Sequence, residues 1–95
     1  MVTLKPRTAH HSFLKKGFRE VRDGDHVVYY FYFNGQKTQI KTHISHNSGD
    51  LTEWHIKMMS KQTKLNRQQF IDLVKCPLLE KDLIGIYLKA KELKN

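Results

Sequence analysis

The chain has 95 residues, a formal net charge of +8 and a hydrophobic fraction of 39%. This length predicts one domain, residues 1–95, and the apolar content excludes a disordered chain. The chain has one cysteine, Cys76, which excludes an internal disulfide and suits a reducing compartment, and no apolar run has the length of a membrane span. We therefore expect a cytoplasmic protein that does not insert into a membrane. Its excess of Lys and Arg favours a polyanionic partner, nucleic acid before an anionic surface.

The N-terminal part of the chain predicts a short helix and then a strand. Residues 12–16 are expected to form the end of a short helix of weak propensity, and Gly17 is typical of the position just after a helix. Polar and apolar residues alternate over 18–23, which predicts a first strand. The sequence Asp23-Gly24-Asp25 that follows is typical of a turn.

A β-hairpin is the clearest local prediction. Residues 26–33 are rich in Val, Tyr and Phe, which favour strands. Asn34 and Gly35 follow, and this dipeptide is the strongest short signal for a two-residue hairpin turn. Residues 36–44 are then expected to return antiparallel to the preceding strand.

The second half of the chain predicts helices. Asp50 and Glu53 have the spacing of a capping box, after which Leu51, Trp54, Met58 and Leu65 share one helical face. Trp54, Met58 and Met59 are expected to lie in the core rather than to contact a ligand. A second box is predicted from Asn66 to Gln69, and Phe70, Leu73 and Val74 give the next helix its apolar side, up to Pro77. A last helix is expected over 80–93, with Leu83, Ile84, Tyr87, Leu88 and Lys91 on one side. The predicted class is therefore α+β, with a three-stranded antiparallel sheet and additional C-terminal helices.

The hairpin also predicts which side chains share a face of the sheet. With Asn34 and Gly35 at the centre of the turn, the facing pairs are Phe33–Gln36, Tyr32–Lys37, Tyr30–Gln39, Val28–Lys41 and His26–His43. Side chains alternate along a strand, so all of these pairs except the first lie on one face. The other face is more apolar and is expected to pack on the helices; it carries Val27, Tyr29, Phe31 and Phe33 with Thr38, Ile40 and Thr42.

The polar face combines the groups that bind and cleave RNA. Lysines attract phosphates, tyrosines offer stacking surfaces for bases, and a histidine pair can move protons near neutral pH. The candidate catalytic residues are His26 and His43, and the candidate RNA-binding residues are Lys37, Lys41, Tyr30 and Tyr32. The alternative is an ordinary solvated sheet face, and a bulge in the hairpin would separate the two histidines.

Three short motifs resemble the HicA family of mRNA-interferase toxins. Gly17-Phe18 and, after Arg22, Gly24-Asp25-His26 resemble the family's Gly-Phe strand start followed by Gly-Ser-His. Ile40-Lys41-Thr42-His43 stands where the family has a valine-proline-x-histidine-like element, and Gly49-Asp50-Leu51 where a Gly-Thr-Leu element opens a helix. This chain has aspartate in place of the serine and lacks the proline.

The resemblance runs over about residues 14–62, where Met58, Met59 and Gln62 fall on the family's closing helix. It implies a HicA-like core at 12–62 with a fold like a double-stranded-RNA-binding domain (helix, three strands, helix), and a C-terminal helical extension at 65–95. It also implies an endoribonuclease that cleaves mRNA, acts as the toxin of a toxin–antitoxin pair, and is inhibited by a HicB-like antitoxin. The family's catalytic histidine maps onto His26.

The chemistry requires no metal or other cofactor, because the 2′-hydroxyl of RNA is the nucleophile. His26 is the candidate general base, and His43 a candidate acid or orienting partner. His46 could complete a metal site with these two, but no carboxylate or thiol is placed to help, so we predict none. His10 and His11 are expected to lie outside any site, and Cys76 to be buried. Competing interpretations are a non-catalytic RNA-binding module and a subunit whose basic face meets an acidic protein.

Overall fold

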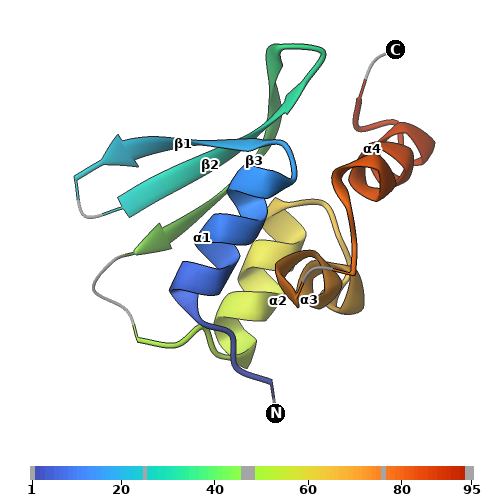
Figure 1. The fold of residues 1–95 in the computed structure, drawn as a ribbon. Helices are drawn as coiled ribbons and strands as arrows, with labels where there is room; N and C mark the ends of the chain where they lie inside the picture. Colours follow the sequence, from blue (N-terminus) through green and yellow to red (C-terminus); the bar gives the residue numbers. More distant parts are fainter. Residues whose placement is uncertain (1, 25, 46–48, 76, 94–95) are drawn as a thin grey trace.

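The computed structural model describes residues 2–24, 26–45, 49–75 and 77–93. In chain order the elements are α1 (Pro6–Lys15), β1 (Phe18–Asp23), β2 (His26–Phe33), β3 (Gln36–Ser45), α2 (Glu53–Gln62), α3 (Arg67–Lys75) and α4 (Glu80–Lys89). The strands form one antiparallel sheet in the order β1-β2-β3. Helices α1 and α2 lie against one face of it, and α3 packs against both helices (Figure 1). The α+β class, the three strands and the additional C-terminal helices are as the sequence predicts.

Helix α1 ends where the sequence predicts the end of a short helix, at Lys15. It begins at Pro6, whose fixed φ suits the first turn of a helix. Its buried residues are Ala9, Ser12 and Phe13. The helix ends before Gly17, which has a φ of 97°, a conformation that favours glycine. The low intrinsic propensity of this segment is therefore overridden by tertiary packing.

The predicted hairpin turn is present, but its register changes within the strands. Asn34 and Gly35 have positive φ angles of 53° and 77°, as a two-residue turn requires. Next to the turn the pairs are Phe33–Gln36 and Tyr32–Lys37, as predicted. Beyond an irregularity between Tyr30 and Tyr32, the pairs are Tyr30–Lys41, Tyr29–Thr42, Val28–His43, Val27–Ile44 and His26–Ser45. The predicted pairs Tyr30–Gln39, Val28–Lys41 and His26–His43 are therefore wrong.

Thr38 accounts for the change of register. Its hydroxyl donates to the Phe31 carbonyl oxygen at 2.6 Å and accepts the Ile40 N–H at 3.2 Å. A side chain thus takes the place of ladder hydrogen bonds where the strands are out of step. The shift amounts to two residues on β3, an even number, so every side chain keeps its predicted face.

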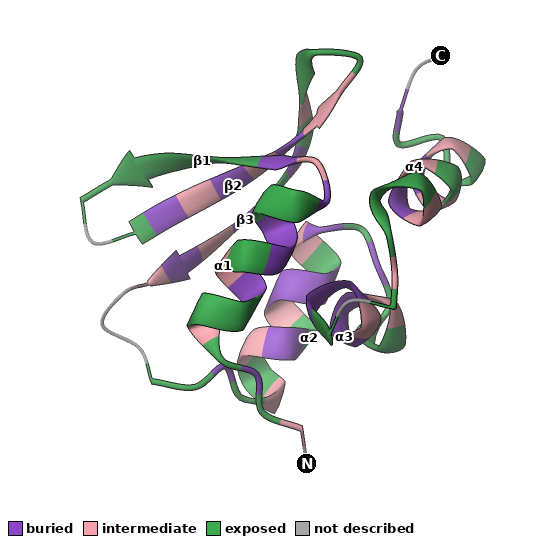
Figure 2. Ribbon diagram, viewed as in Figure 1, coloured by how far each residue is buried: buried purple, intermediate pink, exposed green. Residues whose placement is uncertain are grey.

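The two faces of the sheet divide as predicted. On the helix side, Val27, Tyr29 and Phe31 are buried together with Ile40, Thr42 and Ile44 (Figure 2). Phe33, near the turn, is only partly buried against this core. The buried ring of Phe13 contacts the rings of Phe18 and Tyr29, with centroids 5.1 and 5.0 Å away. This aromatic cluster joins α1 to the sheet and keeps the other face open.

Helix α2 begins later and turns a different side to the core than predicted. Its N-cap is Thr52, whose backbone N–H donates to Nδ1 of His55 at 3.1 Å. Asp50, the predicted cap, instead forms an ion pair with Lys5 at 3.0 Å. The buried side of the helix carries Ile56, Met59 and Ser60, whereas Trp54 is 66% exposed and Met58 half-buried. The expectation that Trp54 and Met58 belong to the core is therefore wrong.

The C-terminal helices pack on the rest of the chain. The box predicted at Asn66 and Gln69 is present: the Asn66 N–H donates to Gln69 Oε1 at 2.9 Å, and the Gln69 N–H to Asn66 Oδ1 at 2.7 Å. The predicted side of α3, with Phe70, Leu73 and Val74, is buried. The buried side chain of Lys16 donates to the Leu73 carbonyl oxygen at 2.7 Å, near the end of α3.

Helix α4 is shorter than predicted and is anchored by Tyr87. It ends at Lys89, and Lys91, with a φ of 62°, is exposed rather than on the apolar side. The Tyr87 ring lies 5.1 Å from that of Phe31, and its hydroxyl donates to the Thr63 carbonyl oxygen at 2.6 Å. Among the described helices, none has the length and apolarity needed to cross a membrane. Cys76 lies outside the described residues.

Candidate functional site

The sheet surface opposite α1 and α2, called the open face below, brings the predicted site residues together. It carries Arg19, Val21 and Asp23 from β1, His26, Val28, Tyr30 and Tyr32 from β2, and Lys37, Gln39, Lys41 and His43 from β3. His26 and the two lysines are exposed, whereas His43 and the two tyrosines are half-buried. The six predicted residues therefore share one surface, because the register change leaves the alternation intact.

Cations lie over the tyrosine rings of this surface. Lys37 Nζ is 4.4 Å from the centroid of the Tyr30 ring, and Lys41 Nζ is 5.7 Å from it. Arg19 Cζ is 4.2 Å from the centroid of the Tyr32 ring. Such contacts stabilise an exposed pair by about 0.5–1 kcal/mol, and they hold the positive charges beside flat aromatic surfaces. The arrangement offers a nucleic acid both phosphate and base contacts.

His26 and His43 meet diagonally across β2 and β3. Their ring centroids are 5.6 Å apart and the rings are perpendicular. They are not cross-strand partners, since His26 pairs with Ser45 and His43 with Val28. Diagonal neighbours on one face are still within reach when the side chains are long or aromatic. The histidine pair therefore exists although the register that predicts it is wrong.

Asp23 is a site residue that the sequence analysis does not identify. It is the cross-strand partner of His26, on the same face of the sheet. A carboxylate beside an imidazole can orient the ring and stabilise its protonated form. Only Gly24 and Asp25 separate Asp23 from His26 in the sequence. A turn predicted between them places Asp23 opposite His26, so this pair was predictable.

A hollow of about 260 Å³ reaches from this end of the open face, past the edge strand β3, to α2. It is lined by Asp23, Val28, Tyr30, Lys41, Thr42, His43 and Gln62. The Thr42 hydroxyl donates to Gln62 Oε1 at 2.7 Å, which leaves the Gln62 amide NH₂ available as a donor. Donors from Lys41, His43 and Gln62 thus border one space, together with the carboxylate of Asp23.

A second, more apolar hollow of about 220 Å³ adjoins His43 on its other side. It is lined by His43, Ile44, Ser45, Leu51, Trp54, His55, Met58 and Met59. Trp54 lies edge-on to His55, with ring centroids 5.2 Å apart. His43 thus separates a polar hollow from an apolar one. The place of Trp54 in the lining of this hollow is not predicted from the sequence, because helical periodicity alone assigns Trp54 to the core.

Among the histidines that the structure describes, none extends the pair into a metal site. Across residues 2–24, 26–45, 49–75 and 77–93, no three His, Cys, Asp or Glu side chains are grouped as metal ligands. His46, the third ligand considered from the sequence, lies outside the described residues. His55 acts at the start of α2, where it accepts the Thr52 N–H.

Comparison of the chain with known protein families, with curated proteins and with solved structures finds no match. The site is therefore interpreted from its own residues and geometry.

Proposed function

We propose that the protein is a metal-independent endoribonuclease that cleaves single-stranded mRNA on the open face. The observation that carries this proposal is the contact between the His26 and His43 rings, whose centroids are 5.6 Å apart, beside a hollow that His43, Lys41 and Tyr30 line. One imidazole to accept a proton, one to donate a proton and a cation for the phosphate are the groups that metal-free RNA cleavage needs.

His26 acts as the general base in the proposed reaction. It takes the proton from the 2′-hydroxyl, whose oxygen attacks the adjacent phosphorus, and the bond from phosphorus to the 5′-oxygen breaks. His43, in its protonated form, gives its proton to the departing 5′-oxygen. The products are a 2′,3′-cyclic phosphate and a free 5′-hydroxyl, so this step requires neither a water molecule nor a metal. Each proton transfer typically contributes about 10²–10⁴-fold in rate.

The other open-face residues hold the RNA strand. Lys41 lies beside His43 and is assigned to the scissile phosphate, whose developing negative charge it stabilises. Lys37 is assigned to a neighbouring phosphate, and Tyr30 and Tyr32 to base stacking. Asp23, opposite His26, is assigned to positioning the general base.

The resemblance of the motifs supports a proposal for the biological class of this activity. The element order α1-β1-β2-β3-α2 agrees with the fold like a double-stranded-RNA-binding domain that the HicA family has. We therefore propose a cytoplasmic HicA-like toxin whose partner is a HicB-like antitoxin. An inhibitor that covers the open face would need acidic groups to match Arg19, Lys37 and Lys41.

The proposal is tested by incubating the purified protein with single-stranded RNA in EDTA. The wild type and Lys81→Ala, which changes an exposed residue of α4, are expected to cleave it to 2′,3′-cyclic phosphate ends. His26→Ala, purified identically and shown to unfold at the same temperature, is expected to lose at least about 100-fold in rate. Equal cleavage by His26→Ala would reject the assigned base and point to a contaminating nuclease.

A non-catalytic RNA-binding module is the second candidate. The placement of Lys37 and Lys41 around the Tyr30 ring favours it, because this contact needs neither histidine. This candidate predicts that the wild type binds RNA in a salt-dependent manner and leaves it intact. The same incubation, followed by a measurement of bound RNA, separates the two candidates.

A further inference from the structure

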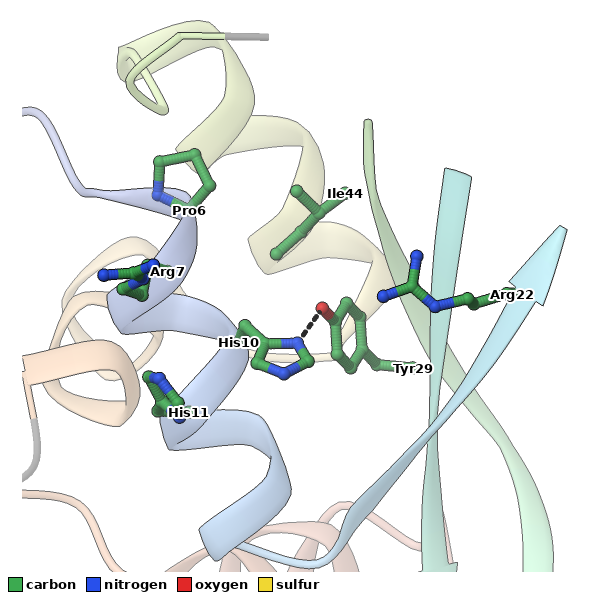
Figure 3. A pocket seen from close by; sticks show the side chains of 7 residues that line it. All are labelled: Pro6, Arg7, His10, His11, Arg22, Tyr29 and Ile44. Atoms are coloured by element: carbon green, nitrogen blue, oxygen red, sulfur yellow. Dashed lines mark hydrogen bonds between the residues drawn. The ribbon is translucent and has the colours of Figure 1, made fainter. Parts of the chain in front are cut away.

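A second basic cavity lies behind the open face, between α1 and the sheet. It has a volume of about 420 Å³ and is lined by Arg7, His10 and His11 of α1, Arg22 of β1 and Tyr29 of β2 (Figure 3). The expectation that His10 and His11 lie outside any site comes from treating residues before 12 as a polar terminus. Because α1 begins at Pro6, both histidines instead face the cavity from the helix.

The residues that line this cavity favour an anion. Two guanidinium groups are permanently charged, and two imidazoles become cations on protonation. None of the described residues that line the cavity carries a carboxylate. Glu20, the exposed cross-strand partner of Tyr29, is a carboxylate on the same face of the sheet.

Tyr29 fixes the orientation of His10. The tyrosine is 1% exposed, and its hydroxyl lies 2.6 Å from Nδ1 of His10. Burial, with a smaller contribution from Glu20, raises the pKa of Tyr29 to about 12, so the phenol keeps its proton at neutral pH. The phenol can therefore donate to Nδ1 of His10 in the tautomer that carries the ring proton on Nε2. In that tautomer, Nε2 of His10 is the hydrogen-bond donor available to a ligand.

The cavity and the histidine pair lie back to back at one end of the sheet. Arg22 lines the cavity and its neighbour Asp23 lines the open-face hollow, while Ile44 and His43 are divided in the same way. Consecutive residues of a strand point to opposite faces. A strand of RNA that leaves His26 over this end of the sheet therefore meets Arg22 and α1 next.

We propose that this cavity binds a phosphate group of the RNA strand, at a nucleotide beyond the one cleaved. Arg7 and Arg22 neutralise the phosphate, and His10 and His11 donate hydrogen bonds to its oxygens. The assignment of the phosphate to RNA rests on the proposed function, whereas the anion chemistry of the cavity does not. A free phosphate or a phosphomonoester offers the same oxygens, so the test includes both sources.

The first arm of the test uses inorganic phosphate with the His26→Ala protein. The imidazole ¹H and ¹⁵N NMR resonances of His10 and His11 are followed during the titration. They are expected to shift and saturate, and the shifts are expected to disappear in the double variant Arg7→Gln, Arg22→Gln. A double variant Lys15→Gln, Lys81→Gln removes the same charge from exposed positions and is expected to behave like the parent. Unchanged resonances, or shifts that persist without the two arginines, would overturn the phosphate site.

The second arm uses single-stranded RNA with methylated 2′-hydroxyls, which cannot be cleaved. Loss of one phosphate contact is expected to weaken binding several-fold and to reduce the slope of log affinity against log salt by about 0.7 in Arg7→Gln, Arg22→Gln. An unchanged slope, with inorganic phosphate still bound by the parent, would overturn the RNA assignment and leave a site for small phosphates. If the wild type fails to cleave RNA but this slope change occurs, only the catalytic proposal is rejected.

Discussion

Tyr29 and Tyr30 are consecutive residues of one strand with opposite environments. Tyr29 is 1% exposed, packs 5.0 Å from the ring of Phe13 and bonds to His10 through its hydroxyl. Tyr30 is half-buried on the open face, with the charged end of Lys37 4.4 Å from its ring. The role of a side chain in this sheet therefore depends on the side of the sheet on which it lies, and not on its residue type.

The two faces should therefore respond differently to substitution. The helix side derives its stability from close packing, so a truncation there leaves a cavity. The open face is wet and carries charge, so a truncation there removes a proposed RNA contact and leaves the fold largely intact. Adjacent residues of β2 lie on opposite faces, so substitutions at neighbouring positions of this one strand measure the difference.

Phe31→Ala is expected to have the largest effect. Phe31 is fully buried between the rings of Phe18 and Tyr87, at 5.2 and 5.1 Å. Its truncation should lower the free energy of unfolding by about 3–5 kcal/mol. Urea denaturation at neutral pH measures this change. Tyr32→Ala, on the open face, should cost no more than about 1 kcal/mol, and equal losses at both positions would contradict the division into faces.

Tyr30→Ala is expected to reduce RNA binding more than stability. Stacking of a base on an aromatic ring contributes about 1–3 kcal/mol, which corresponds to about 5–150-fold in affinity. Fluorescence anisotropy of a labelled RNA with methylated 2′-hydroxyls provides the measurement. Tyr30→Phe keeps the ring and should bind almost as tightly as the wild type. A large loss in Tyr30→Phe would show that the hydroxyl matters and that stacking does not.

Lys41→Gln is expected to change the salt dependence of binding. Removal of one phosphate contact to a single strand should reduce the slope of log affinity against log salt by about 0.7. Lys81→Gln, at an exposed position of α4, provides the charge-matched control. The same slope in both variants would place the RNA somewhere other than beside His43.

Glu53→Gln addresses a region outside both faces and is expected to have the smallest effect. Arg67 donates to this carboxylate through Nε at 3.1 Å and through Nη2, and the Val2 N–H donates to it at 3.2 Å. Hydrogen bonds from Arg67 first, and then from Val2, lower the pKa of Glu53 from 4.5 to about 2. Because the folded-state pKa is depressed, the stabilisation is complete above about pH 4.5 and is lost as the pH falls toward 2.

In urea denaturation, the wild type should therefore lose stability over this range, and Glu53→Gln should lose less of it. Glu80→Gln, which removes an exposed carboxylate from α4, should keep the wild-type pH dependence. Identical pH profiles of the wild type and Glu53→Gln would contradict a role of the Glu53–Arg67 ion pair in stability.

Local signals predicted most of the sheet and part of the helical region. Asn34-Gly35 fixed the turn, strand alternation fixed the faces, and the box at Asn66 and Gln69 fixed the start of α3. The register change was not predictable by counting outward from the turn, because it depends on the Thr38 hydroxyl reaching the Phe31 carbonyl oxygen.

The sequence predicts that the main residues of the candidate site share one face, but it does not predict all of the residues around them. Alternation is a property of each strand, so it placed His26, His43 and the lysines on one face without the correct register. Periodicity predicts which side of a helix is apolar, but it does not predict what that side contacts. It therefore assigns Trp54 to the core, although this side chain is exposed. The basic cavity is not predicted because His10 and His11 are interpreted as part of a polar terminus, whereas α1 brings Arg7 and His10 close to Arg22 in the structure.

The central claim, that the open face binds RNA, is tested most directly by following aromatic ring resonances. NMR spectra of the His26, His43, Tyr29 and Tyr30 rings would be recorded while the wild type is titrated with a dinucleotide methylated at its 2′-hydroxyl. The account predicts large shifts for His26, His43 and Tyr30, and smaller ones for buried Tyr29. Saturable binding that leaves His26, His43 and Tyr30 unshifted would contradict it.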